Sequence, residues 1–300
     1  MKLLDFGSMN IDHTYRLPHL VRHGETLASR QYQRSEGGKG FNQAVALAMA
    51  GQEVFFAGAM GPDGSFLKEY LQSLHVRTDF LRTLDAPTGH AIIQVDEAGE
   101  NAIILFGGTN AMITRDMIDE VLSRFDAGDW LLMQNEISCG DELLHAAHAR
   151  GMRVILNPSP MSEALLAWPL EKVEWLILNE IEGGDLTGCG EPDAILDELL
   201  RRYPACHIVL TLGAEGSVYA DATRRIRQAA VPADAVDTTA AGDTFTGYLI
   251  CALLQGSRIE DALRLASHAA ALAVSRPGAS RSIPRMAEVI RAMEALNENS

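Results

Sequence analysis

The chain has 300 residues, of which 47% are hydrophobic and 22% are charged, with 26 glycines and 11 prolines. These values are typical of a globular protein and exclude collagen-like, low-complexity and disordered chains. Forty acidic and 25 basic residues give a net charge of −15, which argues against non-specific binding to nucleic acid or to an anionic membrane.

Short apolar runs alternate with amphipathic stretches along most of the chain. In chain order, strands are predicted over residues 3–7, 54–58, 130–134, 153–157, 175–178 and 207–212. Helices are predicted up to residue 50 and over 64–74, 141–150, 241–254, 259–274 and 284–296. Strands that alternate with helices indicate an α/β fold, in which a parallel sheet is covered by helices on both faces.

Two segments in the first third of the chain break this alternation. Residues 11–36 are polar and irregular, with a candidate strand at 31–34, while residues 80–106 read as β-hairpins with strands at 91–95 and 102–106. We expect one α/β domain over residues 1–300, with a small β-sheet lid built from about 11–36 and 80–106. Such a lid would cover the sheet edge at which α/β proteins bind ligands.

The stretch E-G-G-K-G-F-N-Q-A at residues 36–44 precedes an apolar helix. Glycines let the backbone approach a ligand closely, and the start of a helix offers free N–H groups. Lys39 and Asn42 add donors suited to hydroxyl groups. The segment matches neither the Walker A spacing nor G-x-G-x-x-G. Taken alone, it fits a plain turn before a helix as well as it fits a ligand site.

A second small-residue segment, D-T-T-A-A-G-D-T-F at residues 237–245, opens another apolar helix. Small residues leave the first amides of a helix uncovered, which favours an anion site or an oxyanion-type hole for a transferring phosphoryl group. Asp243 lies at the start of this helix. A helix N-cap is the alternative interpretation of Asp243, but capping does not explain the second aspartate, Asp237.

Two further motifs each follow a predicted buried strand. In N-E-I-E at 179–182, Asn179 and Glu182 share a helical face, where an amide and a carboxylate suit a phosphate and a hydrated Mg²⁺. The alternative is a capped helix with a surface carboxylate. The sequence T-L-G-A-E-G at 211–216 is a glycine-rich turn that fits either a ligand site or a simple connection.

Taken together and in this order, the motifs are highly specific. The chain resembles the ribokinase-like (PfkB) family of carbohydrate kinases from end to end. Further matching segments are G-S-M-N-I-D at 7–12, Q-N-E at 134–136, L-N-P-S-P at 156–160 and R-P-G-A at 276–279. The resemblance implies a parallel-sheet core with helices on both faces and a β-sheet lid. It also implies transfer of the γ-phosphoryl group of ATP to a sugar hydroxyl, with ribose, giving ribose 5-phosphate, as the leading substrate.

By this resemblance, Asp243 accepts the proton of the attacking sugar hydroxyl. The resemblance places the anion hole at the amides of Ala240, Ala241, Gly242 and Asp243. Such a division of labour suits phosphoryl transfer, which depends mainly on positioning and charge stabilisation. The residues that the resemblance places at the sugar are Asn10, Asp12, Gly38, Lys39, Asn42, Glu136 and Asp243.

The resemblance also implies nucleotide and ion sites. The residues expected at ATP are Asn179, Thr211, Gly213, Gly216 and His268. Of these, His268 would lie beside the adenine, and an ordinary helix histidine is the alternative. Glu182 is expected to serve Mg²⁺, directly or through water. A monovalent cation, expected to be K⁺, would be held mostly by backbone atoms of Asp237, Thr239, Ala273, Arg276, Gly278 and Ser282.

Two departures from the family pattern bear on the sugar. Phe41 stands where a small residue is usual, and Asn135 stands where an apolar residue is usual before Glu136. A ring at position 41 that points at the sugar would reshape the pocket. Another pentose, a hexose such as fructose, or a nucleoside is therefore the alternative substrate. A non-catalytic sugar sensor is the remote alternative, and the absence of G-x-G-x-x-G argues against a dinucleotide-dependent oxidoreductase.

The remaining features indicate a cytoplasmic enzyme. Cys139, Cys189, Cys206 and Cys251 form no C-x-x-C pair, which favours isolated thiols in a reducing compartment. We see no signal peptide and no apolar run long enough to span a membrane. The expected partners are a sugar and ATP, with no nucleic acid and no membrane. The exposed edges of the lid need covering, so we expect a homodimer formed through the lid.

Overall fold

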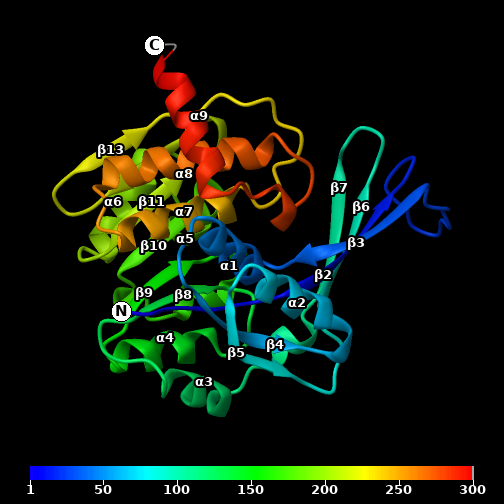
Figure 1. The fold of residues 1–300 in the computed structure, drawn as a ribbon, viewed down its shortest axis with the longest axis horizontal. Coiled ribbons are helices and arrows are strands. Elements are labelled where there is room, and N and C mark those ends of the chain that lie inside the picture. Colours follow the sequence, from blue (N-terminus) through cyan, green and yellow to red (C-terminus); the bar gives the residue numbers. More distant parts are fainter. Residues whose placement is uncertain (299–300) are drawn as a thin grey trace.

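The computed structural model of the chain describes residues 1–298, so the last two residues of the expected domain lie outside the described part. A large sheet forms the centre of the molecule, and a smaller sheet projects from one side of it (Figure 1). The strands of the large sheet are, in spatial order, β13 (Arg225–Gln228), β12 (Ser217–Ala220), β11 (His207–Thr211), β10 (Trp175–Asn179), β9 (Arg153–Asn157), β8 (Trp130–Gln134), β1 (Leu3–Phe6), β4 (Phe55–Met60) and β5 (Arg77–Thr83).

Helices cover both faces of this sheet. They are α1 (Lys39–Met49), α2 (Ser65–Ser73), α3 (Arg115–Leu122), α4 (Gly140–Ala149), α5 (Glu180–Thr187), α6 (Pro192–Arg202), α7 (Ala241–Leu254), α8 (Ile259–Val274) and α9 (Met286–Glu298). Apolar residues of α1, α2, α7 and α8 pack on one face, and those of α3, α4, α5 and α6 pack on the other. The predicted α/β architecture is confirmed.

The central strands are apolar because parallel strands are buried on both faces. β1 pairs in parallel with β8 and β4, and β8 to β11 continue in parallel. Along β1, Leu4 and Phe6 join the core below α3 and α4, whereas Leu3 joins the core below α1. Asp5 is the exception, a fully buried carboxyl group in the middle of the sheet.

The small sheet has the order β3 (Gln31–Gly37), β2 (Asn10–Arg16), β6 (Gly89–Val95) and β7 (Asn101–Phe106). β2 pairs antiparallel with β3 and parallel with β6, and β6 pairs antiparallel with β7. The expectation of an irregular segment at 11–36 is wrong at both ends, because β2 runs through its start and β3 extends beyond residue 34 to Gly37.

The lid boundary expected at about residue 80 is also wrong. Residues 77–83 form β5, which pairs in parallel with β4 at the edge of the large sheet. An edge strand buries little of its surface, and its sequence R-T-D-F-L-R-T is therefore polar enough to resemble a hairpin arm. The strands of the small sheet resume only at Gly89.

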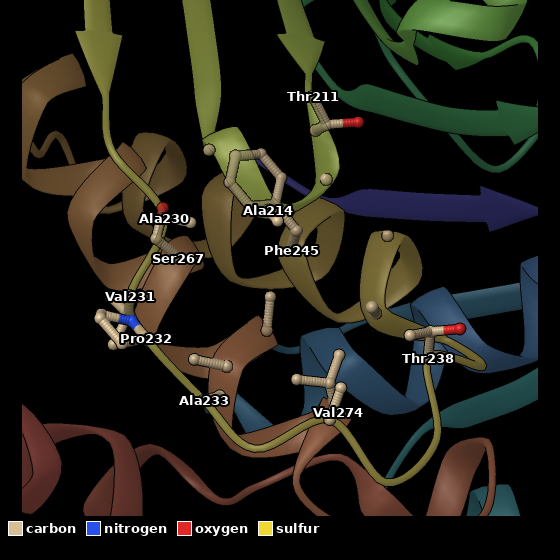
Figure 2. A pocket seen from close by; sticks show the side chains of 17 residues that line it. Thr211, Ala214, Ala230, Val231, Pro232, Ala233, Thr238, Phe245, Ser267 and Val274 are labelled. Atoms are coloured by element: carbon tan, nitrogen blue, oxygen red, sulfur yellow. The ribbon is translucent and has the colours of Figure 1, made fainter.

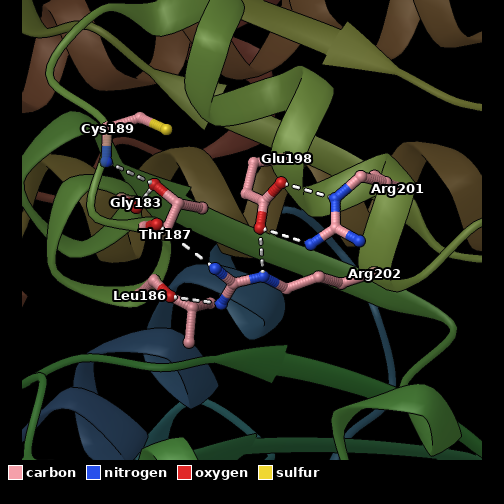
Figure 3. Close-up of polar contacts among 7 residues, drawn as sticks. All are labelled: Gly183, Leu186, Thr187, Cys189, Glu198, Arg201 and Arg202. Carbon is pink, nitrogen blue, oxygen red and sulfur yellow. Dashed lines mark hydrogen bonds and ion pairs between the residues drawn. The ribbon is translucent and has the colours of Figure 1, made fainter.

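A polar cluster fixes the C-terminal end of α5, the helix that begins with N-E-I-E (Figure 3). Arg202 on α6 donates to the carbonyl oxygens of Leu186 and Thr187, at 2.8 and 3.2 Å. The carboxylate of Glu198 holds this guanidinium and that of Arg201, and these hydrogen bonds lower the pKa of Glu198 to about 2. A cation at a helix C-terminus satisfies carbonyls that the helix leaves unpaired, so α5 presents its N-terminus to the sheet edge from a fixed position.

None of the helices in the described part of the chain is long and apolar enough to cross a membrane. The four cysteines are free thiols.

Candidate active site

The N-terminus of α7 is an uncapped helix end. Its N-cap is Ala240, in a left-handed conformation with φ of 60°, and no side chain hydrogen-bonds there. The amide of Ala241 donates to the carbonyl oxygen of Thr238 at 3.2 Å, so one of the four amides expected in the anion hole is engaged in a turn. Those of Ala240, Gly242 and Asp243 have no hydrogen-bond partner within residues 1–298. Three free amides at a helix start form a site for an anion.

Asp243 is not the N-cap of α7, which excludes the capping interpretation. Its carboxylate instead faces α1, where the Asn42 side-chain amide donates to one oxygen at 3.1 Å and that of Gln43 donates to the other at 2.9 Å. The side chain is buried. The two helices approach this closely because Gly247 on α7 has no Cβ: an added Cβ would lie 2.4 Å from that of Ala46.

Gln43 connects Asp243 to polar side chains on the sheet below. Its amide nitrogen also donates to Asn157 on β9, at 3.0 Å, and its carbonyl oxygen accepts from Gln134 on β8, at 2.7 Å. Gln134 in turn donates to Asp5 on β1, at 3.1 Å. All of these side chains are buried, so the Asp243 carboxylate rests on a hydrogen-bonded support that ends in the central strand.

Glu136 follows β8 and holds the glycine-rich loop. One of its carboxylate oxygens accepts from the backbone amide of Lys39 at 2.9 Å and from the hydroxyl of Ser8. The loop lies directly on the end of β1. A Cβ added at Gly40 would lie only 2.6 Å from the Ser8 amide nitrogen. Gly38, with φ of 94°, has the conformation that glycine tolerates best.

The expected sugar residues of β2 lie at the base of the small sheet. Asn10 is buried, and its side-chain oxygen accepts from Asn110 at 2.8 Å. Asp12 lies over Gly37, where an added Cβ would come within 2.2 Å of its carboxylate. Burial, and then the charges of Glu136 and Glu36, raise the pKa of Asp12 to about 7. Asp12 therefore changes charge near neutral pH.

A small polar cavity of about 220 Å³ joins several of the motifs. It is lined by Lys39, Asn157, Ser159, Ile177, Leu178, Asn179, Glu182, Thr211, Thr238, Ala240, Gly242, Asp243 and Thr246. Of the residues expected at the sugar, only Lys39 and Asp243 line it. Asn42 adjoins it through its hydrogen bond to Asp243, and Glu136 through its hydrogen bond to the Lys39 amide, whereas Asn10 and Asp12 do not line it.

Asn179 and Glu182 form a reciprocal capping box at the start of α5. The Asn179 side chain accepts from the Glu182 amide at 2.8 Å, and one Glu182 oxygen accepts from the Asn179 amide at 3.0 Å. The capping interpretation is therefore correct for this pair, and both residues nevertheless line the small cavity. The second Glu182 oxygen makes no hydrogen bond within the described residues, and a carboxylate oxygen of this kind suits hydrated Mg²⁺.

A larger and mostly apolar cavity of about 600 Å³ lies beside the small one, between the end of β11, the segment 230–238 and helices α7 and α8 (Figure 2). The two cavities share Thr211, Thr238 and Gly242. Thr211, Gly213 and Gly216 line the large cavity as expected for a nucleotide site. His268 does not line it. The His268 ring is hydrogen-bonded to the Arg264 carbonyl oxygen at 2.8 Å, and its neighbour Ser267 faces the cavity instead.

Two of the residues expected at a monovalent cation, Thr239 and Gly278, contact Asp237. The amides of Thr239 and Gly278 donate to its two carboxylate oxygens, at 2.9 and 3.0 Å. Burial opposes ionisation, but these hydrogen bonds lower the pKa of Asp237 below its usual value. Within residues 1–298, the carbonyl oxygens of Asp237, Thr239, Arg276 and Gly278 accept no hydrogen bond. Such oxygens suit a cation, and the residues present therefore fit one.

Two concerns about the sugar pocket are resolved by burial and contacts. The Phe41 side chain is fully buried in the core, with its ring 6.0 Å from that of Tyr70, and it lines neither cavity. The Asn135 side chain donates to the Pro160 carbonyl oxygen at 2.6 Å and to the Ser162 hydroxyl at 3.0 Å, away from the cavities. Neither side chain shapes the space around Asp243.

The sequence-based prediction gives no role to several residues of the site, although most of them lie in the motifs that it quotes. They are Gln43, Asn110, Gln134, Asn157 and Thr238. Gln43 and Gln134 are polar side chains at otherwise apolar positions of a helix and a strand, which is a recognisable signal. Asn110 lies in a short 3-10 helix and Thr238 in the loop that begins the 237–245 motif, and in neither place does residue type alone carry such a signal.

Comparison with known proteins agrees with this geometry. Residues 2–286 match the family described as pfkB family carbohydrate kinase. The ribokinase of Haemophilus influenzae is 34% identical over 305 residues, covering 96% of this chain and 97% of that one. The structure of the ribokinase of Cryptococcus neoformans in complex with ADP covers 97% of this chain and 99% of its own, with a TM-score of 0.86 and 35% identity. The Arabidopsis thaliana ribokinase complexed with ribose and ATP covers 97% of both chains, with a TM-score of 0.84 and 31% identity.

Proposed function

The chain belongs to the pfkB family of carbohydrate kinases, and we propose that it transfers the γ-phosphoryl group of ATP to ribose, giving ribose 5-phosphate. The observation that carries this proposal is the placement of Asp243. Its carboxylate stands beside free amides at the start of α7, in a small polar cavity that shares residues with a larger apolar one. A sugar hydroxyl at Asp243 and a nucleotide in the large cavity would meet at those amides.

The chemistry assigned to these residues follows from their positions. Asp243 orients the sugar hydroxyl and accepts its proton as the bond to phosphorus forms, and Gln43 and Asn42 hold the carboxylate in place. The amides of Ala240, Gly242 and Asp243 stabilise the charge on the transferred group. Lys39 and Glu136, joined by a backbone hydrogen bond, bind further sugar hydroxyls together with Asn10, Asp12 and the Gly38 loop.

Two ions complete the proposed site. Glu182 would hold hydrated Mg²⁺ near the phosphates, where Asn179 would contact the nucleotide, and this ion would neutralise phosphate charge. The carbonyl oxygens of Asp237, Thr239, Arg276 and Gly278, with Ala273 and Ser282 beside them, would hold K⁺ behind the start of α7. A cation there adds positive potential to the free amides, so we expect K⁺ to increase turnover.

The small sheet acts as a lid on a single α/β domain in this proposal. Its strands β2 and β3 carry Asn10, Asp12 and the approach to the glycine-rich loop, so a movement of the sheet would close over the sugar. Closure excludes water and so limits hydrolysis of ATP.

The first test is release of ADP from MgATP in the presence of ribose, deoxyribose, other pentoses, fructose, other hexoses and nucleosides. We expect ribose to give the highest kcat/KM, and K⁺ to exceed Na⁺ and cation-free buffer as an activator. A strong preference for another compound would replace ribose as the substrate. ATP binding without turnover on any compound would favour a non-catalytic sugar sensor.

We expect ribose binding to weaken as the pH falls below 7. Burial and the charges of Glu136 and Glu36 raise the pKa of Asp12 to about 7, so a growing fraction of the free enzyme carries the neutral acid below that pH. A sugar hydroxyl that donates to Asp12 binds the ionised form, and the KM for ribose should therefore rise about tenfold between pH 8 and pH 6. Initial rates across this range measure the change.

The matched variant for this experiment is Asp12→Asn, which has no charge to lose. Its KM for ribose should be higher than that of the wild type at pH 8 and nearly independent of pH. If the wild-type KM is equally flat, Asp12 is not the group that controls binding.

The proposed dimer is formed through the outer edge of the lid. β7 is an edge strand, and its apolar side chains are exposed, with 60% of Ile104 and 49% of Phe106 accessible to solvent. Exposed apolar edges favour pairing with another chain. Light scattering should give the mass of two 32.5 kDa chains for the wild type and of one chain for Ile104→Glu. Leu166→Glu, an equally exposed position outside the lid, is the control, and a monomeric wild type would exclude the dimer.

A further inference from the structure

Asp5 has a buried carboxyl group to which the proposed function assigns no role in catalysis or substrate binding. It lies in the middle of β1, its side chain is completely buried, and its neighbours along the strand are Leu3, Leu4 and Phe6. A charged group at such a position is costly unless it is paired. No cation pairs with it in the described part of the chain, and its one hydrogen bond comes from the amide of Gln134.

The orientation of the Gln134 side chain follows from the hydrogen bonds that Gln43 makes with Asp243 and Gln134. The Asp243 carboxylate can only accept hydrogen bonds, so Gln43 must turn its amide nitrogen toward it. The carbonyl oxygen of Gln43 then faces Gln134 and accepts from the Gln134 amide nitrogen. The same nitrogen donates its second hydrogen to Asp5.

Two oxygen atoms at the Asp5 end of this series of hydrogen bonds have no partner among residues 1–298. They are Oδ2 of Asp5 and Oε1 of Gln134, both buried, on side chains that already share one hydrogen bond. Two acceptors cannot bond to each other without a proton between them. A carboxylic acid and a primary amide, by contrast, pair through both of their groups, with N–H donating to one acid oxygen and the acid O–H donating to the amide oxygen. A proton shared between Oδ2 of Asp5 and Oε1 of Gln134 would satisfy both atoms.

The space for this pair is provided by Gly7 on the same strand end. A Cβ at Gly7 would lie 2.2 Å from Gln134 Oε1 and 3.2 Å from Asp5 Oδ1. Both side chains thus converge on the place that a side chain at position 7 would occupy.

We propose that Asp5 is a positioning residue of the phosphoryl-transfer site, and that its neutral carboxyl group fixes Gln134 and, through Gln134, the Gln43 amide that holds Asp243. Burial raises the pKa of Asp5 well above its ordinary value, the Gln134 hydrogen bond lowers it, and the charge of Asp243 raises it further. Asp243 on α7 is the ionisable group that acts on Asp5, and the side chain that hydrogen-bonds to Asp5, Gln134 on β8, is a neutral amide. The role assigned to Asp5 rests on the proposed function of Asp243.

Asp5→Asn is the decisive variant, because asparagine copies the neutral acid. Its oxygen accepts from Gln134 Nε2 and its amide nitrogen donates to Gln134 Oε1. We expect kcat at pH 7 within about threefold of the wild type, since the positioning is preserved. The infrared difference spectrum between the two proteins at pH 7 should contain the C=O band of a protonated carboxylic acid and lack a carboxylate band.

Thermal unfolding supplies a second measurement. In the unfolded chain Asp5 ionises near pH 3.8, whereas the folded protein retains the proton to a higher pH. The proton therefore stabilises the wild type at low pH, and this contribution to the free energy of unfolding decreases as the pH rises above about 4. The asparagine of the Asp5→Asn variant has no proton to lose. The Tm of Asp5→Asn relative to the wild type should increase by at least about 3 °C between pH 5 and pH 8.

Asp5→Leu tests positioning itself, because leucine leaves the Gln134 amide without its fixed partner. We expect kcat to fall about tenfold or more with the KM for ATP within about twofold, and asparagine at this position to rescue kcat. If Asp5→Leu does not fold, the infrared spectrum and the pH dependence of Asp5→Asn decide the question.

Three results would overturn the proposal: a carboxylate band for Asp5, a folded Asp5→Asn with kcat reduced tenfold or more, or wild-type kcat in a folded Asp5→Leu. These outcomes differ from a failure of the proposed function. If the wild type itself transfers no phosphoryl group to any sugar or nucleoside, the infrared and Tm results still report whether Asp5 is neutral.

Discussion

Asp243→Asn should lower kcat about 10³-fold, with the KM for ATP close to that of the wild type. Asparagine cannot accept the proton of the sugar hydroxyl, and a general base of this kind contributes about 10²- to 10⁴-fold. The nucleotide is expected in the large cavity, which Asp243 does not line, so ATP binding should persist. Release of ADP with ribose measures kcat, and titration of ATP with the variant measures binding.

The same substitution should also reduce stability, which provides an internal check. The Asp243 carboxylate accepts from two amide donors, Asn42 and Gln43, whereas an asparagine has one acceptor oxygen and an amide group that faces the other donor. One buried donor then lacks a partner, at a cost of about 1–3 kcal/mol. Asp116→Asn, an exposed aspartate on α3, is the control and should change neither quantity. Turnover of Asp243→Asn within tenfold of the wild type would show that Asp243 is not the base.

Gly40→Ala should lower the free energy of unfolding by about 3 kcal/mol. Its new Cβ would lie 2.6 Å from the Ser8 amide nitrogen and 2.7 Å from the Gly7 Cα, both backbone atoms that cannot rotate away. Overpacking of this kind typically costs about 1–3 kcal/mol, and contact with backbone lies at the upper end. α1 would have to move away from the end of β1, taking Asn42 and Gln43 with it. Denaturant unfolding measures the stability, and kcat should fall as well.

Gly190→Ala is the matched control for this experiment. Gly190 is also a glycine outside the sheet, but an added Cβ there meets nothing within 4 Å and its φ is not positive. We expect its free energy of unfolding to stay within about 0.5 kcal/mol of the wild type. Equal stability of Gly40→Ala and Gly190→Ala would mean that the loop adjusts and that the close approach is not required.

The buried elements of the fold were predictable because their composition leaves little choice. The strands at 130–134 and 153–157 and the helices at 241–254 and 259–274 have the predicted bounds, since continuous burial or an apolar stripe marks both ends. β5 and β2 were not identified, because an edge strand and a lid strand expose polar residues on at least one face. Their pairing is decided by neighbours that are distant in sequence.

The same contrast applies to the site. Asp243 and the loop at 237–242 were predicted from a local motif, whereas the hydrogen bond from Gln43 to Asp243 spans 200 residues of sequence. Sequence spacing carries no information about such a contact until α1 and α7 are known to touch. Asp5 lies within the apolar segment L-L-D-F, and nothing in the sequence indicates its partner.

Because no side chain caps the start of α7, the first turn of this helix has unpaired amides in the ligand-free enzyme. Its N-cap is Ala240, and the amides of Gly242 and Asp243 have no hydrogen-bond partner within residues 1–298. A phosphate group arriving at Gly242 and Asp243 would supply the missing cap. The substrate would then act as part of the secondary structure, and the first turn of α7 would exchange its amide hydrogens with solvent more slowly once the nucleotide is bound.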